Sequence, residues 1–329
     1  MSNNLPATLV TGAGGFIASH LIEALLPRAA ALRAFVHYNS RGDPGLLNLL
    51  PTATRREIDI VAGDLRDLEA VDKAVQGCEL VLHLGALISI PYSYRHPVEV
   101  VETNVSGSLN VLLAARRANV TRLVHTSTSE VYGTAQRVPI DEDHPLQGQS
   151  PYSASKIAAD KLAESFYRSY DLPVVTLRPF NTYGPRQSAR AVIPTIIAQA
   201  LTQPEVRLGN LAARRDLTYV EDTVDGFLRA AQQPGLEGQT INLGSGSEIT
   251  IADLAKDIIA LIGNSVELVE DASRLRPEKS EVERLLADNS RAQKLLGWRP
   301  VTPLKRGLQQ TIDWMAENID LYQPERYQI

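Results

Sequence analysis

A tyrosine and a lysine four positions apart are the residues best suited to acid–base chemistry. Tyr152 and Lys156 belong to the segment Tyr152-Ser-Ala-Ser-Lys156, and on a helix this spacing puts both side chains on one face. A free tyrosine has a pKa of about 10 and is a poor base at neutral pH. A nearby ammonium and a cationic nicotinamide both favour the phenolate, which then accepts a hydroxyl proton. Taken alone, the pair also fits a solvated surface helix.

A polar cluster lies about twenty residues before this pair. The segment Thr126-Ser-Thr-Ser-Glu-Val-Tyr-Gly133 begins in the last two residues of the predicted strand 122–127 and continues beyond it. Because the carboxyl ends of parallel strands face the ligand crevice, we expect Thr128, Ser129 and Glu130 beside a bound nicotinamide. A polar strand end can also be a simple helix cap, but the tyrosine–lysine pair downstream favours catalysis.

A glycine-rich turn near the start of the chain predicts a dinucleotide site. Thr11-Gly-Ala-Gly-Gly-Phe-Ile-Ala18 follows a predicted strand at 7–11 and opens a helix at about 16–26. Glycines permit the tight turn and a close approach to a pyrophosphate, and the free N–H groups of the helix start face the phosphates. The residues expected to contact the cofactor here are Gly12, Gly14, Gly15, Phe16 and Ile17.

The residues that would hold the adenosine leave the choice of cofactor open. NAD enzymes usually place an acid at the end of the second strand, but this chain reads Val36-His-Tyr-Asn-Ser-Arg41 there. Ser40 and Arg41, with Asn39, suit a 2′-phosphate instead. Asp64, after the third strand, is expected to bind the adenine amino group, or else to cap its loop. We expect NAD, with NADP as the open alternative.

The elements that position these residues alternate between short apolar runs and helices. This pattern predicts an α/β fold, a Rossmann doubly wound parallel sheet with a smaller C-terminal substrate-binding lobe. Strands are expected at 33–37, 58–62, 80–84, 174–178, 217–220 and 240–243, and helices at 68–76, 100–118 and 151–170, the last capped by Ser150. The connection 38–56 reads as a loop. We expect the dinucleotide-binding domain to comprise 1–180 plus 216–245, and the lobe 181–215 plus 246–329.

Composition excludes several classes of protein. The chain has 329 residues, 44% of them hydrophobic, and a net charge of −5, so we expect no nucleic-acid partner. No apolar run is long enough for a membrane span and no signal-peptide pattern is present. The single cysteine, Cys78, excludes an internal disulfide framework and fits a reducing compartment. We therefore expect a cytoplasmic protein, and no metal site.

In combination, the motifs resemble those of the extended short-chain dehydrogenase/reductases, specifically the NDP-sugar epimerase/dehydratase branch. The resemblance implies a Thr128–Tyr152–Lys156 triad, with Lys156 also near the nicotinamide ribose and Asn104 organising a water or backbone contact. It also implies cofactor contacts at Leu65, Leu84 and Ala86. Besides the segments above, it rests on Gly63-Asp64-Leu65, His83-Leu-Gly-Ala86, Asn104-Val-Ser-Gly107, Arg178-Pro-Phe-Asn-Thr-Tyr-Gly-Pro185 and Arg215-Asp-Leu-Thr-Tyr-Val-Glu-Asp222.

Within this family the reaction depends on Ser129 and Glu130. Sugar 4,6-dehydratases carry Glu at the second position as the base for the C5 proton, and epimerases usually lack it. The Thr-Ser-Glu triplet is similar both to GDP-mannose-type dehydratases and to UDP-glucuronate decarboxylases. Longer segments, such as Gln187-Ser-Ala-Arg-Ala-Val-Ile-Pro194, resemble the sequences of LegB-type 4,6-dehydratases, which act on nucleotide-activated N-acetylglucosamine. A decarboxylase, an epimerase and a non-catalytic NAD(P)-binding regulator stay as alternatives.

The nucleotide sugar is expected in the second lobe. Arg215 and Arg276 match family positions that bind the pyrophosphate, to which forked guanidinium groups are suited. The segment Val206-Arg-Leu-Gly209 resembles one that flanks the nucleobase, whose identity the sequence does not specify. The family also implies a homodimer built from the helix of Tyr152 and the one after Asn104. Further expected substrate contacts are Ser89, Thr128, Asn181, Arg186, Arg190, Val192 and Arg207.

Overall fold

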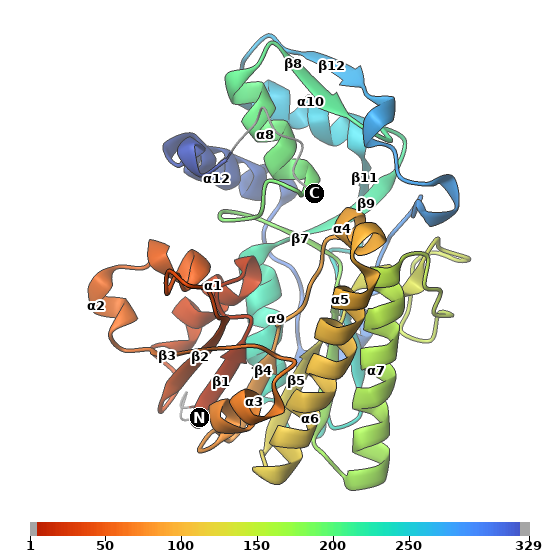
Figure 1. Ribbon diagram of the computed structural model, residues 1–329. Coiled ribbons are helices and arrows are strands. Elements are labelled where there is room, and N and C mark those ends of the chain that lie inside the picture. Colours follow the sequence, from red (N-terminus) through yellow and green to blue (C-terminus); the bar gives the residue numbers. More distant parts are fainter. Residues whose placement is uncertain (1–4, 323–329) are drawn as a thin grey trace.

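The computed structural model describes residues 5–322 and has a parallel sheet at its centre (Figure 1). In the described part of the chain this sheet has seven strands in the order β10-β6-β5-β4-β1-β2-β3, and every neighbouring pair is parallel. The order reverses at β1, where a doubly wound sheet binds its ligand. The strands are β1 (Thr8–Thr11), β2 (Leu32–His37), β3 (Asp59–Gly63), β4 (Leu80–His83), β5 (Arg122–Thr126), β6 (Val174–Pro179) and β10 (Thr240–Leu243). The predicted Rossmann fold is confirmed.

Helices cover both faces of this sheet because successive strand residues point to opposite sides. Leu9 of β1 belongs to one buried apolar cluster and Val10 to another. Helices α1 (Phe16–Leu25) and α9 (Val220–Gln232) contact each other over one face, and α3 (Leu68–Val75), α6 (Gly107–Arg117) and α7 (Pro151–Tyr170) pack side by side over the other. Figure 1 shows α6 and α7 running together along that second face.

The smaller lobe stands above the carboxyl ends of the strands (Figure 1). It contains a three-stranded sheet of β11 (Glu248–Thr250), β9 (Arg214–Tyr219) and β7 (Asn181–Tyr183), and a pair of β12 (Glu267–Glu270) with β8 (Glu205–Leu208). Helices α8 (Val192–Thr202), α10 (Ile251–Ile262) and α12 (Leu304–Glu317) pack against these strands. Strand β9 lies outside the seven-stranded sheet, although most of it was expected in the dinucleotide-binding part; the two-domain division stays a prediction.

Two expected segments differ in detail from the structure. The helix predicted at 100–118 begins earlier, as α5 (Pro97–Val101), and passes through a π-helical turn, η2 (Glu102–Ser106), before α6. Asn104 lies in that turn, a type of irregularity often found at functional sites. The expected loop 38–56 contains η1 (Gly45–Leu49) and α2 (Thr52–Arg55). The remaining short elements are α4 (Ile90–Arg95), η3 (Ser129–Tyr132), η4 (Ala272–Arg274), η5 (Glu278–Ser280), α11 (Ser290–Leu296) and η6 (Ile319–Leu321).

Helix α7 begins and ends where the sequence predicts. The Ser150 hydroxyl accepts a hydrogen bond from the N–H of Ser153 at 3.1 Å, and the Ser153 hydroxyl accepts one from the N–H of Ser150 at 3.0 Å. This reciprocal capping box satisfies two N–H groups that would otherwise lack partners at the helix start. It fixes the first turn of α7, on which Tyr152 stands.

We predict that Ser150→Ala lowers the free energy of unfolding by about 1 kcal/mol, because the helix loses its N-cap acceptor. Urea denaturation followed by circular dichroism measures the change. Ser165→Ala, at an exposed position of the same helix, is the matched control and should stay within about 0.5 kcal/mol of the parent protein. Equal effects of the two substitutions would contradict a special role for the cap.

Candidate active site

The glycine turn after β1 has the geometry of a phosphate-binding site. Gly12 has a φ of +66°, and a Cβ there would lie 2.6 Å from the Cα of Gly85, in the loop after β4. Only glycine fits such a close approach. Gly15 is the N-cap of α1 and no side chain caps that helix, so its first N–H groups stay available to an anion. The residues present fit a dinucleotide pyrophosphate.

The loop after β2 folds back onto this turn. The N–H of Leu46 donates to the carbonyl of Gly14 at 3.0 Å. The Asn39 side-chain oxygen accepts hydrogen bonds from the N–H groups of Arg41 at 3.1 Å and Asp43 at 3.0 Å. Asn39 thus shapes the loop, and Ser40 and Arg41 are left exposed. The adenosine contacts expected of these residues stay predictions.

Asp64, expected near the adenine, is paired within its own loop. Its carboxylate accepts a hydrogen bond from the Arg66 guanidinium at 2.6 Å and another from the Arg66 N–H at 2.9 Å. The bond from the Arg66 side chain lowers the pKa of Asp64. This geometry favours the loop-cap interpretation of Asp64, and its contact with adenine stays a prediction.

Tyr152 and Lys156 lie together in the interior and not on a solvated surface. They are 6% and 3% exposed, so the alternative of a solvated surface pair is wrong. The Lys156 Nζ donates to the main-chain carbonyl of Thr126 at the end of β5, at 2.6 Å. Burial lowers the pKa of Lys156 to about 8 and raises the pKa of Tyr152, while a hydrogen bond with Thr128 opposes that rise. The structure therefore brings Thr128, Tyr152 and Lys156 together.

Glu130 follows in the short helix η3. Thr128 caps this helix by accepting a hydrogen bond from the Glu130 N–H at 3.2 Å. Ser129 is buried and Glu130 is half-buried. The negative charge of Glu130 is one of several effects on the pKa of Tyr152 and of Arg215, and it acts to raise both. The carboxylate therefore lies near both side chains. The site thus places an additional base beside the tyrosine.

Asn104 ties the loop after β4 to α7. Its side-chain oxygen accepts from the Leu87 N–H at 2.8 Å, and its amide donates to the Leu87 carbonyl and to the Ser155 hydroxyl, both at 2.9 Å. These bonds satisfy a fully buried amide. They hold the segment containing Leu84 and Ala86 against the helix that carries Tyr152.

Arg215 of the lobe lies near both Glu130 and Arg276. Arg215 on β9 is 8% exposed and pairs with Glu281 at 3.3 Å. Burial lowers the pKa of Arg215, and the neighbouring charge of Arg276 lowers it further. The Nη1 atom of Arg276 is buried and has no hydrogen-bond partner among the described residues. Since buried donors are rarely left unpaired, this N–H is suited to a phosphate oxygen of a ligand.

The other expected substrate contacts have local partners. Arg186 pairs with Glu23 of α1 at 2.5 Å, and Arg207, whose side chain is exposed on β8, pairs with Glu205 at 2.5 Å. The substrate contacts expected of both arginines stay predictions. The remaining positions are Arg190, which donates to Ser188 at 3.1 Å, Asn181, which donates to the carbonyl of Asp216 at 3.4 Å, Ser89, the N-cap of α4, and Val192, the first residue of α8.

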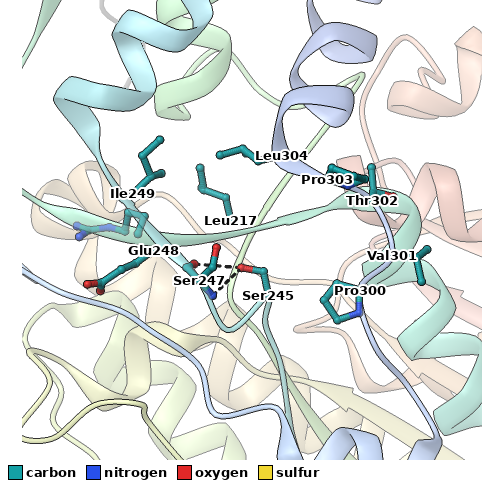
Figure 2. Close-up of a pocket in the computed structure, with 11 residues that line it drawn as sticks. Leu217, Ser245, Ser247, Glu248, Ile249, Pro300, Val301, Thr302, Pro303 and Leu304 are labelled. Atoms are coloured by element: carbon teal, nitrogen blue, oxygen red, sulfur yellow. Dashed lines mark hydrogen bonds between the residues drawn. The ribbon is translucent and has the colours of Figure 1, made fainter.

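A cavity of about 450 Å³ lies beside β9 (Figure 2). Its lining includes Arg215 and Leu217 of β9, Ser245 and Ser247 after β10, and residues 300–304. The Ser245 hydroxyl donates to the carbonyl of Ser247 at 3.1 Å and so holds that wall in a turn. Tyr152 and Lys156 do not line this cavity.

Several buried polar residues beneath Tyr152 and Lys156 were not predicted from the sequence. Asp160 is buried and accepts hydrogen bonds from His125 at 3.1 Å, Ser127 at 2.8 Å and Arg178 at 3.0 Å. It follows Tyr152 and Lys156 at the same four-residue spacing, which was a visible signal of a shared helix face. Its partners come from β5 and β6, and no local pattern in the sequence indicates them.

Two kinds of feature are absent from residues 5–322. No cluster of three or more His, Cys, Asp or Glu side chains there has an arrangement that could hold a metal ion. No helix in that range is both long and apolar enough to cross a membrane.

Comparison with known proteins identifies the family. Residues 9–311 match the family model described as GDP-mannose 4,6 dehydratase. The chain belongs to this family. The resemblance to the extended short-chain dehydrogenase/reductases of the sugar-nucleotide branch is thereby confirmed.

The family members named in these comparisons act in more than one way. The chain is 34% identical over 316 residues to a UDP-glucose 4-epimerase of Mycolicibacterium smegmatis, covering 93% of this chain and 97% of the relative. It is 31% identical to a dTDP-glucose 4,6-dehydratase of Streptomyces niveus, covering 96% and 94%. A dTDP-glucose 4,6-dehydratase of Streptomyces venezuelae, solved with NAD bound, superposes with a TM-score of 0.87 at 31% identity, covering 97% of this chain and all of that one.

The buried Lys156 predicts an unusual pH dependence of stability. Its pKa falls from 10.5 to about 8 on folding, so the unfolded chain binds more protons than the folded chain between these pH values. The free energy of unfolding should therefore gain roughly 3 kcal/mol from this residue as pH rises from 8 to 10.5. This increase in the free energy of unfolding should be absent in Lys156→Met. It should persist in Lys161→Met, which alters an exposed position of the same helix. Urea denaturation across this pH range measures the difference.

Proposed function

We propose that the protein is an NDP-sugar 4,6-dehydratase that converts a nucleotide-activated hexose or N-acetylhexosamine into its 4-keto-6-deoxy derivative. The observation that carries the proposal is Glu130, a carboxylate near both Tyr152 and the phosphate-side Arg215. Elimination requires a base in addition to the tyrosine, and Glu130 supplies it. The sequence of residues 187–194 is similar to that of LegB-type enzymes, and this similarity supports an N-acetylhexosamine as the sugar.

The cofactor proposed is tightly bound NAD, with NADP as the open alternative. The glycine turn and the uncapped start of α1 fit its pyrophosphate, and the similar Streptomyces venezuelae enzyme was solved with NAD. Bound there, NAD would supply a hydride acceptor for C4 of the sugar and, in its reduced form, a hydride donor for C6. Because the hydride returns within one turnover, the reaction needs no external oxidant.

The chain's own residues move the protons. Tyr152, ionised beside the Lys156 ammonium, accepts the O4 proton while Thr128 holds that hydroxyl. The C4 ketone acidifies the C5–H, and Glu130 accepts that proton. The C6 hydroxyl leaves as water after receiving a proton from Ser129 or a bound water. A proton then returns to C5, so the net change is the loss of one water.

The epimerase alternative is favoured by one observation, the 34% identity to a UDP-glucose 4-epimerase. Epimerisation at C4 needs the tyrosine–lysine pair but no base for C5, so it leaves Glu130 without a function. A UDP-glucuronate decarboxylase would share the Thr-Ser-Glu triplet. The burial and assembly of Thr128, Tyr152 and Lys156 favour an enzyme over a non-catalytic regulator.

The predicted homodimer and cytoplasmic location stay predictions. Phe166 of α7 is buried in the protein's own core, and Leu162 packs against the same cluster. The apolar residues that α5 leaves exposed are Val98 and Val101, at 68% and 45%. Helix α5 packs against α7, so this surface is continuous with the helices of the expected dimer.

The purified protein, given no cofactor, should release water from one sugar nucleotide in a panel of UDP-, GDP-, CDP- and dTDP-sugars. For a dehydratase, mass spectrometry should show a product about 18 mass units lighter than the substrate, which is the mass of one water. Loss of carbon dioxide from UDP-glucuronate would establish the decarboxylase, and an isomer of unchanged mass the epimerase. Either result would overturn the dehydratase proposal and keep the family assignment.

Glu130→Gln should slow water loss by about 10²–10⁴-fold, because the C5 proton loses its acceptor. Oxidation at C4 needs Tyr152 and Lys156 and should survive, so NADH absorbance should accumulate in the variant on adding substrate. The parent enzyme in D₂O should place one deuterium at C5 of the product. Glu142→Gln, which alters a buried glutamate paired with Arg291, is the control and should not accumulate NADH. Full dehydratase activity in Glu130→Gln would reject Glu130 as the base.

A further inference from the structure

Asp160 is a buried acid without a part in the mechanism above. Its side chain is 4% exposed, and an isolated carboxylate is costly to bury. It nevertheless stays ionised. Burial opposes ionisation, but the hydrogen bond from His125 and the charge of Arg178 lower the pKa of Asp160 below its ordinary value.

The position of Asp160 relates it to the catalytic pair. Tyr152, Lys156 and Asp160 follow one another at four-residue intervals on α7 and are all buried. Residues at this spacing share a helix face. The carboxylate charge of Asp160 acts on the Lys156 ammonium and opposes the effect of its burial.

The surrounding elements contribute a second cation and two neutral imidazoles. Arg178 of β6 donates to Asp160 through Nε at 3.2 Å and Nη2 at 3.0 Å. Burial lowers the pKa of His83 on β4 and of His125 on β5, so both rings are neutral at neutral pH. The other titratable groups facing this cluster are Glu130 and Tyr132, from η3; Glu130 acts on Tyr152, and Tyr132 donates to Asn242 and accepts from Arg178.

The charges of Lys156, Arg178 and Asp160 therefore sum to one net positive charge until the tyrosine ionises. Lys156 and Arg178 contribute two positive charges, and Asp160 contributes one negative charge. The phenolate of Tyr152 would be the second negative charge. Without Asp160, the buried ammonium of Lys156 would lose the one opposite charge that acts on it among the described residues, and Lys156 would give up its proton more readily.

We propose that Asp160 is a positioning residue for proton transfer, which keeps Lys156 charged and held at the end of β5 so that Tyr152 can ionise. This inference rests on the proposed function for the roles of Tyr152 and Lys156. Asp160 itself touches neither substrate nor cofactor in this scheme. It acts through Lys156.

The direct test titrates Lys156 by carbon-13 NMR in protein labelled at the lysine Cε, with Lys156→Met to assign the signal. Asp160→Asn should move this titration to lower pH by at least about one unit, because the ammonium loses its counter-ion. Ser127→Ala removes a hydrogen bond to the same carboxylate but no charge, and is the matched control with an unchanged titration. An unchanged Lys156 titration in folded Asp160→Asn overturns the proposal.

Arg178→Gln provides a second, opposite test, which stands if Asp160→Asn fails to fold. Arg178 pairs with Asp160, so its removal leaves the Asp160 charge less compensated and should move the Lys156 titration to higher pH. Circular dichroism checks that each variant is folded. If the Lys156 titration in Arg178→Gln moves to lower pH, or does not move, the charge relation among Lys156, Asp160 and Arg178 described above is contradicted.

The kinetic test uses the turnover of the whole enzyme. In Asp160→Asn the rising limb of kcat against pH should move up by about one unit, a roughly tenfold loss at a pH below that limb, with KM unchanged. In a Lys156→Met background, Asp160→Asn should cause no further loss of kcat, because the lysine through which it acts is gone. Additive losses would indicate a purely structural role. If no nucleotide sugar is turned over by the parent enzyme, the proposed function fails, and the NMR titrations still decide the role of Asp160.

Discussion

A charged lysine held in a nearly dry interior is the constraint on which the catalytic part of this structure depends. Lys156 is 3% exposed and its ammonium needs acceptors and a counter-ion at short range. The main-chain carbonyl of Thr126 is one acceptor, at 2.6 Å. That carbonyl is free to accept because β5 ends there and the chain turns into η3. The end of a central strand and the first turns of α7 must therefore keep a fixed relation.

Other features of the fold maintain that relation. The capping box of Ser150 and Ser153 fixes the start of α7. Asn104, in its π-helical turn, joins α7 to the loop after β4 through Leu87 and Ser155. That loop in turn approaches the glycine turn so closely that Gly12 has no room for a Cβ beside Gly85. The expected phosphate site and the Tyr152–Lys156 pair are thus parts of one packed unit, and a shift in either is transmitted to the other.

What the sequence predicts correctly is what local spacing determines. The parallel strands, the extent of α7 and its Ser150 cap follow from periodicity and capping residues, and the glycine turn from its place between strand and helix. The π-helical turn at Asn104 was not predicted, because the hydrogen bonds of this side chain reach a loop seventeen residues away and leave no local pattern in the sequence. The pairing of Arg186 with Glu23 was not predicted, because Glu23 is distant in sequence; the substrate contact expected of Arg186 stays a prediction. Asp160 was not predicted for the same reason. Its hydrogen-bond partners Arg178 and His125 lie on β6 and β5, and they come together only when these two strands pair.

The division of relatives into epimerases and dehydratases has a physical basis in this arrangement. Oxidation at C4 needs only a proton acceptor and a neighbouring cation, and both come from the rigid face of α7 against the sheet. The later steps depend on groups that meet the sugar from η3 and from the lobe, where Glu130 lies near Arg215. In the proposed scheme, a change of one side chain in η3 would change the reaction without disturbing the fold or the buried charges around Lys156. The identities of 31–34% to both kinds of enzyme extend over almost the whole chain and do not separate the two reactions, so the proposal of a dehydratase rests on Glu130.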